Sequence, residues 1–362
     1  MTFSQFRART LRPRWPLWLA AGAGAVVIGV AGCTRAPEPE FVSSDAVKKL
    51  SPELQSRVVA ILDENCGTAA GPKMLGDQKM ESEHVKAGQA LYMENCVRCH
   101  GVTGDGNGPV AKFMRPRPRD YRKGIFKFTT RPYGSRPRRA DLLRTVRRGI
   151  PGTSMPSFRL LPDADIEALV DYVLVLTHRG ELESELAIEA DSSNEIAAGF
   201  PAEATASVLQ RWKTAESGEV QALTPMPVFG VENVKRGRQA FLTKGCSKCH
   251  GEDGRGQTRD NNFVDSWGFQ TRAADLTSGL LHGGPEPIDV YRRVHSGING
   301  TPMPGFASAL SKEPETIWDL VSYVFYVSNR RREKEIPPAG PIPQPVTASA
   351  NGGAATSAKS GS

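Results

Sequence analysis

The sequence contains few hydrophobic residues and only one long hydrophobic run. Hydrophobic residues make up 39% of the 362 residues. The run from Trp15 to Gly32 is the one stretch close to the roughly 20 residues that a membrane-spanning helix requires. Residues after about position 35 are therefore expected to be water-soluble. The 36 glycines and 27 prolines indicate turn-rich units joined by flexible stretches, so a fibrous or wholly disordered chain is excluded. The length leaves room for two or three domains.

The charge of the chain is polarised. The formal net charge is +7, which by itself admits nucleic acid, an anionic membrane or an acidic protein as partner. Between Lys112 and Arg148, fourteen Lys and Arg residues face two Asp residues, a local charge of +12, so the rest of the chain sums to −5. We expect this basic segment either to be simply solvated or to attract an acidic protein partner to the first half of the chain.

The N-terminus indicates export. Four arginines precede the run of Trp15 to Gly32: Arg7, Arg9, Arg12 and Arg14. This is the pattern of a secretory signal or a membrane anchor, so residues 1–33 form a targeting segment. The run ends in Val30-Ala31-Gly32-Cys33, which resembles the lipobox of bacterial lipoproteins and makes Cys33 a lipid attachment site. An uncleaved transmembrane helix is the alternative. Either arrangement holds the protein on the periplasmic side of the membrane, where nucleic acid is not a partner.

Cysteine is scarce, and most of it lies in one repeated motif. Of six cysteines, four form Cys-x-x-Cys pairs followed directly by histidine: Cys96, Cys99 and His100, then Cys246, Cys249 and His250. Two thiols at this spacing can add to the two vinyl groups of a haem while the next residue lies under the iron. A redox disulfide or zinc site explains Cys-x-x-Cys but not the two following histidines. The motifs therefore predict two covalently bound c-type haems.

The two motifs belong to a duplicated unit. The segment from Val85 before the first motif matches the segment from Val234 before the second, and a later segment of each half matches as well. Each unit closes with an amphipathic helix, expected over 163–177 and 314–328. We predict domain one over 85–180 and domain two over 231–330, preceded by an N-terminal extension (34–84), joined by a partly helical linker (181–230) and followed by a disordered tail (331–362).

The sequence around the first motif, Cys96-Val97-Arg98-Cys99-His100-Gly101 followed by Gly104-Asp105-Gly106-Asn107-Gly108-Pro109, resembles the haem-binding segment of class I c-type cytochromes. The whole chain is similar to two-domain dihaem cytochromes c of bacterial respiratory chains. The resemblance implies a mainly α fold with two tandem class I cytochrome c domains. In that family a proline carbonyl usually orients the axial histidine, a role that Pro109 would fill. Domain two has no corresponding Gly-Pro sequence. We therefore expect the group that accepts the hydrogen bond from His250 to lie near Trp267-Gly268.

The sixth iron ligands are expected to be methionines. Met155 and Met303 occupy the same place in a Gly-Thr-x-Met-Pro turn, 55 and 53 residues after their histidines. Each lies in a Gly/Pro loop instead of on a helix face, which favours ligation over core packing. His282 aligns with Lys127 and His295 with Arg147. Because a ligand position should not alternate with Lys or Arg, these two histidines are expected to be surface residues or haem propionate neighbours.

Two His/Met-ligated haems leave no coordination position for a substrate, which favours electron transfer over catalysis. We expect a membrane-tethered carrier, or a cytochrome subunit of an oxidase or dehydrogenase complex, with a quinol- or dehydrogenase-side donor and an oxidase-side acceptor. The alternative is a dihaem cytochrome c peroxidase, in which one haem must open a position for peroxide. The matching turns at Met155 and Met303 argue against it.

Overall fold

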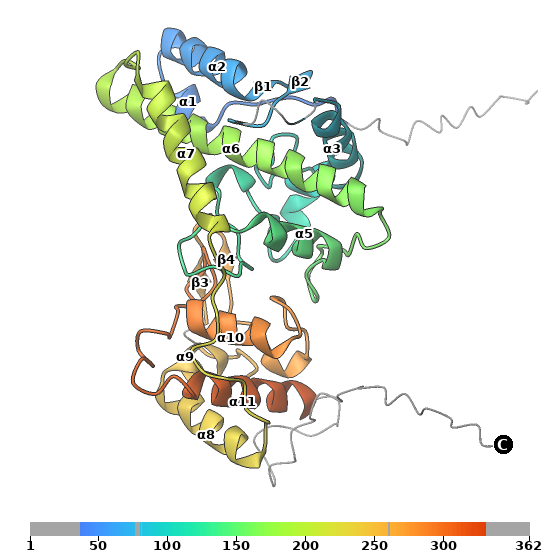
Figure 1. The fold of residues 1–362 in the computed structure, drawn as a ribbon, viewed down its shortest axis with the longest axis vertical. Helices are drawn as coiled ribbons and strands as arrows, with labels where there is room; N and C mark the ends of the chain where they lie inside the picture. Colours follow the sequence, from blue (N-terminus) through green and yellow to red (C-terminus); the bar gives the residue numbers. More distant parts are fainter. Residues whose placement is uncertain (1–36, 77–79, 81, 260, 331–362) are drawn as a thin grey trace, which may run out of the picture. The chain divides into compact units, whose positions relative to one another are not determined.

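Both domains of the protein are built mainly of α-helices (Figure 1). The computed structural model describes residues 37–76, 80, 82–259 and 261–330, so Cys33, the targeting segment and the predicted tail lie outside the described residues. The first part of the chain contains α1 (Asp45–Lys48), α2 (Pro52–Cys66), β1 (Gly67–Thr68), β2 (Gly71–Pro72), α3 (Ser82–Asn95), α4 (Val97–His100), η1 (Ala111–Phe113), η2 (Tyr121–Lys123), α5 (Arg139–Arg148), α6 (Asp163–Ser193) and α7 (Phe200–Glu216). The second part contains α8 (Val231–Thr243), α9 (Cys246–His250), β3 (Phe263–Val264), β4 (Gln270–Thr271), η3 (Leu276–Ser278), α10 (Pro287–Ser296) and α11 (Thr316–Arg330). The prediction of a mainly α fold is confirmed.

In each domain the first helix crosses the last helix through a glycine. A Cβ atom on Gly88 of α3 would overlap the backbone carbonyl of Ala168 in α6. Gly237 of α8 makes the same close approach to the carbonyl of Asp319 in α11. No residue with a side chain fits at these distances, so glycine lets the two backbones pack directly. The crossing places the C-terminal end of α3 directly before its Cys-x-x-Cys-His motif, and that of α8 before the second motif with two residues between them.

The two domains have separate hydrophobic cores. In domain one, Tyr92 of α3 packs on Tyr172 of α6 with their ring centroids 5.4 Å apart. Its counterpart in domain two is Phe241 of α8, whose ring centroid is 5.1 Å from that of Tyr323 of α11. The first core also takes in side chains from the N-terminal extension and the linker. Although the cores are distinct, the described residues all belong to one compact unit.

Helix α6 is longer than the sequence predicted. The pattern indicated a helix over 163–177, whereas α6 continues to Ser193 and ends at Asn194, which adopts a left-handed conformation with φ of 55°. The extra turns pack against α7 and α2, as Figure 1 shows. Val208 and Trp212 of α7 are buried, and the helix itself agrees with the predicted partly helical linker. The first half of the linker is therefore part of the hydrophobic core of domain one.

Helix α2 lies in the N-terminal extension, where it spans Pro52–Cys66 and buries Val58, Ile61 and Leu62. Both strand pairs, β1–β2 and β3–β4, are short antiparallel hairpins. In the part of the chain that the structure describes, no helix is both long enough and apolar enough to cross a bilayer.

We expect Cys66 to resist alkylation while the protein is folded. Its side chain is 1% exposed, and burial raises the pKa of the thiol to about 12. Because the thiolate is the nucleophile, roughly one thiol in 10⁴ is reactive at pH 8. Treatment with iodoacetamide followed by mass spectrometry of the Cys66 peptide should show labelling only after unfolding in urea. Rapid labelling of the native protein would contradict this placement.

Candidate functional site

Each Cys-x-x-Cys-His motif forms a short helix of its own directly after the first helix of its domain. In domain one the backbone N–H of Cys96 donates to the carbonyl of Tyr92 at 2.8 Å, which ties the motif to α3. The N–H groups of Cys99 and His100 then donate to the Cys96 carbonyl at 3.1 and 2.9 Å. This single turn brings the two thiols and the imidazole together. In domain two the same residues form α9, Cys246–His250.

The loop after each motif folds back on the histidine in the same way. The N–H of Gly106 donates to the His100 carbonyl at 2.8 Å, and Gly256 repeats this bond to His250 at 2.7 Å. Further along, the N–H of Tyr121 donates to the Gly104 carbonyl at 2.7 Å, matched by Leu276 to Gly254 at 2.8 Å. The duplication seen in the sequence therefore extends to the hydrogen bonds of these loops.

A backbone carbonyl orients each histidine, but it is not the one that the sequence indicated. The Nδ1 atom of His100 lies 3.2 Å from the Arg119 carbonyl, and Nδ1 of His250 lies 3.1 Å from the Ala274 carbonyl. Because a carbonyl only accepts, Nδ1 carries the proton in both rings and Nε2 is left as the nitrogen with a free electron pair. The expectations for Pro109 and for Trp267-Gly268 were therefore wrong.

The two acceptors share a local pattern that the sequence contained. Each directly precedes an aspartate, Asp120 or Asp275, whose side chain accepts a hydrogen bond from the N–H two residues later and begins a 3₁₀ helix. The motif-to-acceptor spacing differs between the domains, 19 residues in one and 24 in the other. An alignment that assumes a constant distance in sequence from the histidine could therefore not identify Arg119 and Ala274 as the acceptors.

Burial sets the protonation of these side chains. Burial lowers the pKa of His100 to about 4 and lowers the pKa of His250 as well. Burial also raises the pKa of Cys96 to about 12 and that of Cys246 to about 11. At neutral pH both imidazoles are therefore neutral, the form that binds a metal ion, and both thiols are protonated.

Both methionine turns have the same backbone structure. The Thr153 hydroxyl accepts a hydrogen bond from the N–H of Met155 at 3.1 Å and donates to the Ile150 carbonyl at 2.8 Å. In domain two, Thr301 makes the corresponding bonds to Met303 and Ile298 at 3.3 and 2.8 Å. The Met155 and Met303 side chains are half-buried, unlike a methionine that fills a hydrophobic core.

These residues fit a c-type haem. Each site offers two thiols at the ends of one helical turn and a neutral imidazole with Nε2 available. It also has a thioether in a turn of fixed backbone structure, and this donor set is the one used by His/Met cytochromes. Each domain thus contains the types of side chain that the sequence predicted, and the structure adds the carbonyl groups of Arg119 and Ala274 as partners of the two histidines.

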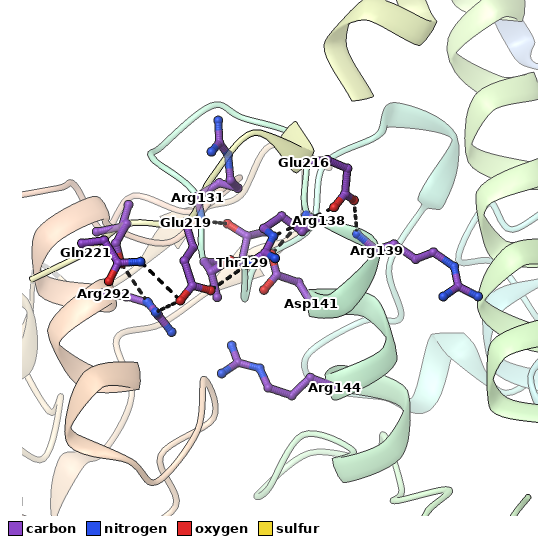
Figure 2. Close-up of polar contacts among 12 residues, drawn as sticks. Thr129, Arg131, Arg138, Arg139, Asp141, Arg144, Glu216, Glu219, Gln221 and Arg292 are labelled. Atoms are coloured by element: carbon purple, nitrogen blue, oxygen red, sulfur yellow. Dashed lines mark hydrogen bonds and ion pairs between the residues drawn. The ribbon is translucent and has the colours of Figure 1, made fainter. Parts of the chain in front are cut away.

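Charged side chains join domain one, the linker and domain two. The carboxylate of Glu219 in the linker bonds the guanidinium groups of Arg138 at 2.7 Å and Arg292 at 2.8 Å, as Figure 2 shows. Arg144 of α5 forms an ion pair with Asp289 of α10 at 2.5 Å, and the Asp289 side chain is 1% exposed. Removing one partner of such a buried pair costs about 3–5 kcal/mol. The two domains are therefore held together by specific charge pairs.

Most cations of the basic segment, residues 112–148, form ion pairs within the protein. Its cations within 4.0 Å of a carboxylate are Arg119, Arg122, Lys127, Arg136, Arg138, Arg139, Arg144, Arg147 and Arg148. By contrast, Lys112 and Arg115 are exposed; the Lys112 ammonium lies over the ring of Phe113. Simple solvation of the whole segment is therefore wrong, because much of its charge fixes the protein's own structure.

The remaining histidines take different places. His282 faces Phe128 of domain one, with ring centroids 6.5 Å apart, and the His295 Nδ1 atom lies 2.9 Å from the Ser296 hydroxyl. His178 lies in the middle of α6, beyond the predicted helix end at residue 177, because that helix continues. It is buried against Trp212, with ring centroids 4.9 Å apart.

Comparison with known proteins agrees with this geometry. Residues 83–173 match the family model described as "Cytochrome C oxidase, cbb3-type, subunit III", and residues 234–328 match the model "Cytochrome c". A search of the curated proteins gave no significant match. The chain belongs to the c-type cytochromes and carries two such domains in tandem.

One solved structure is similar to this chain over most of its own length. The chain is similar to one from the "Kuenenia stuttgartiensis reducing HAO-like protein complex Kustc0457/Kustc0458". The identity is 29% and the TM-score 0.53, over 67% of this chain and 96% of the other.

We expect Gly149→Ala to destabilise domain one and its methionine turn. Gly149 has a φ of 66°, and a Cβ atom there would lie 2.5 Å from the carbonyl carbon of Pro156. Strain and overlap together should lower the free energy of unfolding by about 3 kcal/mol, measured by urea denaturation. Gly245→Ala is the matched control, because Gly245 has a φ of 93° with nothing within 4 Å of its Cβ position. Equal losses in both variants would show that the turn tolerates the overlap.

Proposed function

We propose that this protein transfers electrons through two covalently bound c-type haems. The observation that carries the proposal is the histidine of each domain, held at Nδ1 by a backbone carbonyl next to a Cys-x-x-Cys pair. His100 is buried and His250 is half-buried. Cys96, Cys99, Cys246 and Cys249 attach the haems. His100 with Met155, and His250 with Met303, would bind the two irons.

The surrounding residues suit electron transfer without substrate binding. A haem at each site supplies an iron that accepts and releases one electron. The Arg119 and Ala274 carbonyls hold the imidazoles, and the turns at Met155 and Met303 hold the thioethers, so little has to move when the charge changes. A dihaem peroxidase needs one open position. Because the two turns have the same hydrogen bonds, the structure favours a carrier.

The protein acts together with other redox proteins. The similar Kuenenia chain is part of a protein complex, which supports a role as a cytochrome subunit of an oxidoreductase complex. A membrane-tethered carrier in a respiratory chain, between a quinol- or dehydrogenase-side donor and an oxidase-side acceptor, is the other form of the same function. Immunoprecipitation from detergent-solubilised membranes distinguishes the fixed subunit from the tethered carrier, because only a fixed subunit is recovered in constant ratio to its partners.

The protein is exported and held at the periplasmic side of the membrane. The support is the arginine-rich start, the hydrophobic run up to Gly32 and the lipobox-like Val30–Cys33. In this proposal Cys33 carries the lipid, with a transmembrane helix as the alternative. Mass spectrometry of the mature N-terminus distinguishes a lipidated Cys33 from an uncleaved segment.

We expect Met155→Ala and Met303→Ala each to remove about half of the near-infrared band that methionine-ligated ferric haem shows, since each site supplies one thioether. The midpoint potential of the affected haem should fall, because thioether sulfur stabilises reduced iron. Potentiometric titration with near-infrared detection measures both. Met226→Ala is the control, because Met226 is 57% exposed in the linker.

Two outcomes would contradict the proposal. An unchanged near-infrared band in Met155→Ala would remove Met155 as a ligand. Turnover of hydrogen peroxide at enzymatic rates by the reduced or mixed-valence wild-type protein would replace the carrier by the peroxidase.

We expect electron transfer into domain one from the anion ferrocyanide to slow several-fold between 10 and 100 mM NaCl. The Debye length falls from about 30 Å to about 10 Å over this range, which screens the exposed charges of Lys112 and Arg115. The double variant Lys112→Glu/Arg115→Glu should lose most of this dependence in stopped-flow measurements. Lys213→Glu, an exposed change on α7, should keep it. A wild-type rate independent of salt would exclude attraction of an acidic partner to this surface.

A further inference from the structure

One loop of domain two contacts the backbone segment that orients the histidine of domain one. This loop connects β3 to β4 and contains Trp267. The Arg119 guanidinium carbon lies 3.4 Å from the centre of the Trp267 ring, and the indole Nε1 donates to the Asp120 carbonyl at 3.4 Å. The Asp265 carboxylate adds an ion pair to Arg119 at 3.9 Å.

Arg119 therefore serves both domains. Its backbone carbonyl accepts the hydrogen bond from His100 Nδ1 at 3.2 Å, while its side chain is held by Trp267 and Asp265 of domain two. The corresponding acceptor for His250 is the carbonyl of Ala274. The methyl side chain of alanine can form neither a cation–π contact nor an ion pair. The carbonyl that holds the histidine of domain one thus belongs to a residue whose side chain contacts domain two.

The Trp267 loop is itself well fixed. The Asp265 side chain accepts hydrogen bonds from the N–H groups of Trp267 and Phe269 at 3.0 and 3.1 Å. The N–H of Ser266 donates to the Gly300 carbonyl at 3.0 Å. A Cβ atom on Gly300 would overlap the Trp267 ring, so the indole packs directly on the start of the Met303 turn. The Arg119 and Asp265 side chains are 14% and 7% exposed, so this contact is shielded from water.

We propose that Trp267 of domain two is a positioning residue for the axial histidine of domain one. By holding Arg119 and Asp120, Trp267 keeps the Arg119 carbonyl in place, and this carbonyl sets the orientation and basicity of the His100 ring. Docking of domain two thereby lowers the potential of the domain-one haem, because a more basic imidazole stabilises ferric iron. The inference rests on the proposed haem sites and adds coupling between them.

The test compares Trp267→Leu with Phe269→Leu in the full-length, haem-loaded protein. Phe269 lies on the same loop, and its ring centre is 4.9 Å from the guanidinium carbon of Arg117. Phe269→Leu therefore removes a similar cation–π contact without touching the His100 acceptor. Proton NMR should show the His100 Nδ1–H exchanging with solvent about tenfold faster in Trp267→Leu only, because its hydrogen bond opens more often. The Nδ1–H of His250 is the internal reference and should not change.

A potentiometric titration gives the second readout. At a fixed applied potential, the ratio of reduced to oxidised domain-one haem should rise about threefold in Trp267→Leu, with the domain-one step identified from Met155→Ala. Trp267→Phe keeps a ring on Arg119 and loses only the Nε1 bond, so it should give a smaller change of the same sign and decides the matter should Trp267→Leu not fold.

Two kinds of failure can be told apart. If the wild-type protein shows no low-spin haem, the proposed function fails. If it shows two such haems, and exchange at His100 is unchanged in the Trp267 variants or changes equally in Phe269→Leu, the coupling alone is overturned.

Discussion

The close crossing of two helices at a glycine is the constraint on which each domain depends. At Gly88 and Gly237 the backbone of the first helix touches the backbone of the last, with no room for a Cβ atom. The aromatic pairs Tyr92–Tyr172 and Phe241–Tyr323 pack beside these crossings. Because the Cys-x-x-Cys-His turn follows the first helix directly, the crossing fixes where the thiols and the imidazole lie. The methionine turn precedes the last helix and is thereby brought into the same domain.

The second level of organisation is electrostatic. A segment with a local charge of +12 would repel itself if its cations were free, yet most of them lie beside carboxylates of other segments. Glu219 bridges Arg138 and Arg292, and Asp289 neutralises part of the charge of α5. The charge of domain one thus orders the linker and docks domain two, and a smaller part of it, at Lys112 and Arg115, is exposed.

Local patterns in the sequence predicted the haem motifs, the duplicated unit and the helices that frame them, because each depends on spacing within one stretch of chain. The turns at Met155 and Met303 were found by aligning the halves, and their hydrogen bonds match in the structure. The end of α6 was misplaced because its later turns are stabilised by packing on α2 and α7, a tertiary effect. The acceptors of the histidines were missed because their separation from the motif differs between the domains.

The sequence by itself contained the patterns that predict a cofactor and its place: two Cys-x-x-Cys-His motifs, two matching methionine turns and a charged segment of one sign. Covalent attachment and ligation depend on the kind of residue and on its spacing, which the sequence contains. The tertiary structure decided which carbonyl holds each imidazole, which carboxylates take up the basic charge and how Trp267 reaches Arg119. These are contacts between residues far apart in the chain, up to 148 positions for Arg119 and Trp267, and their partners are chosen by packing and burial instead of by local pattern.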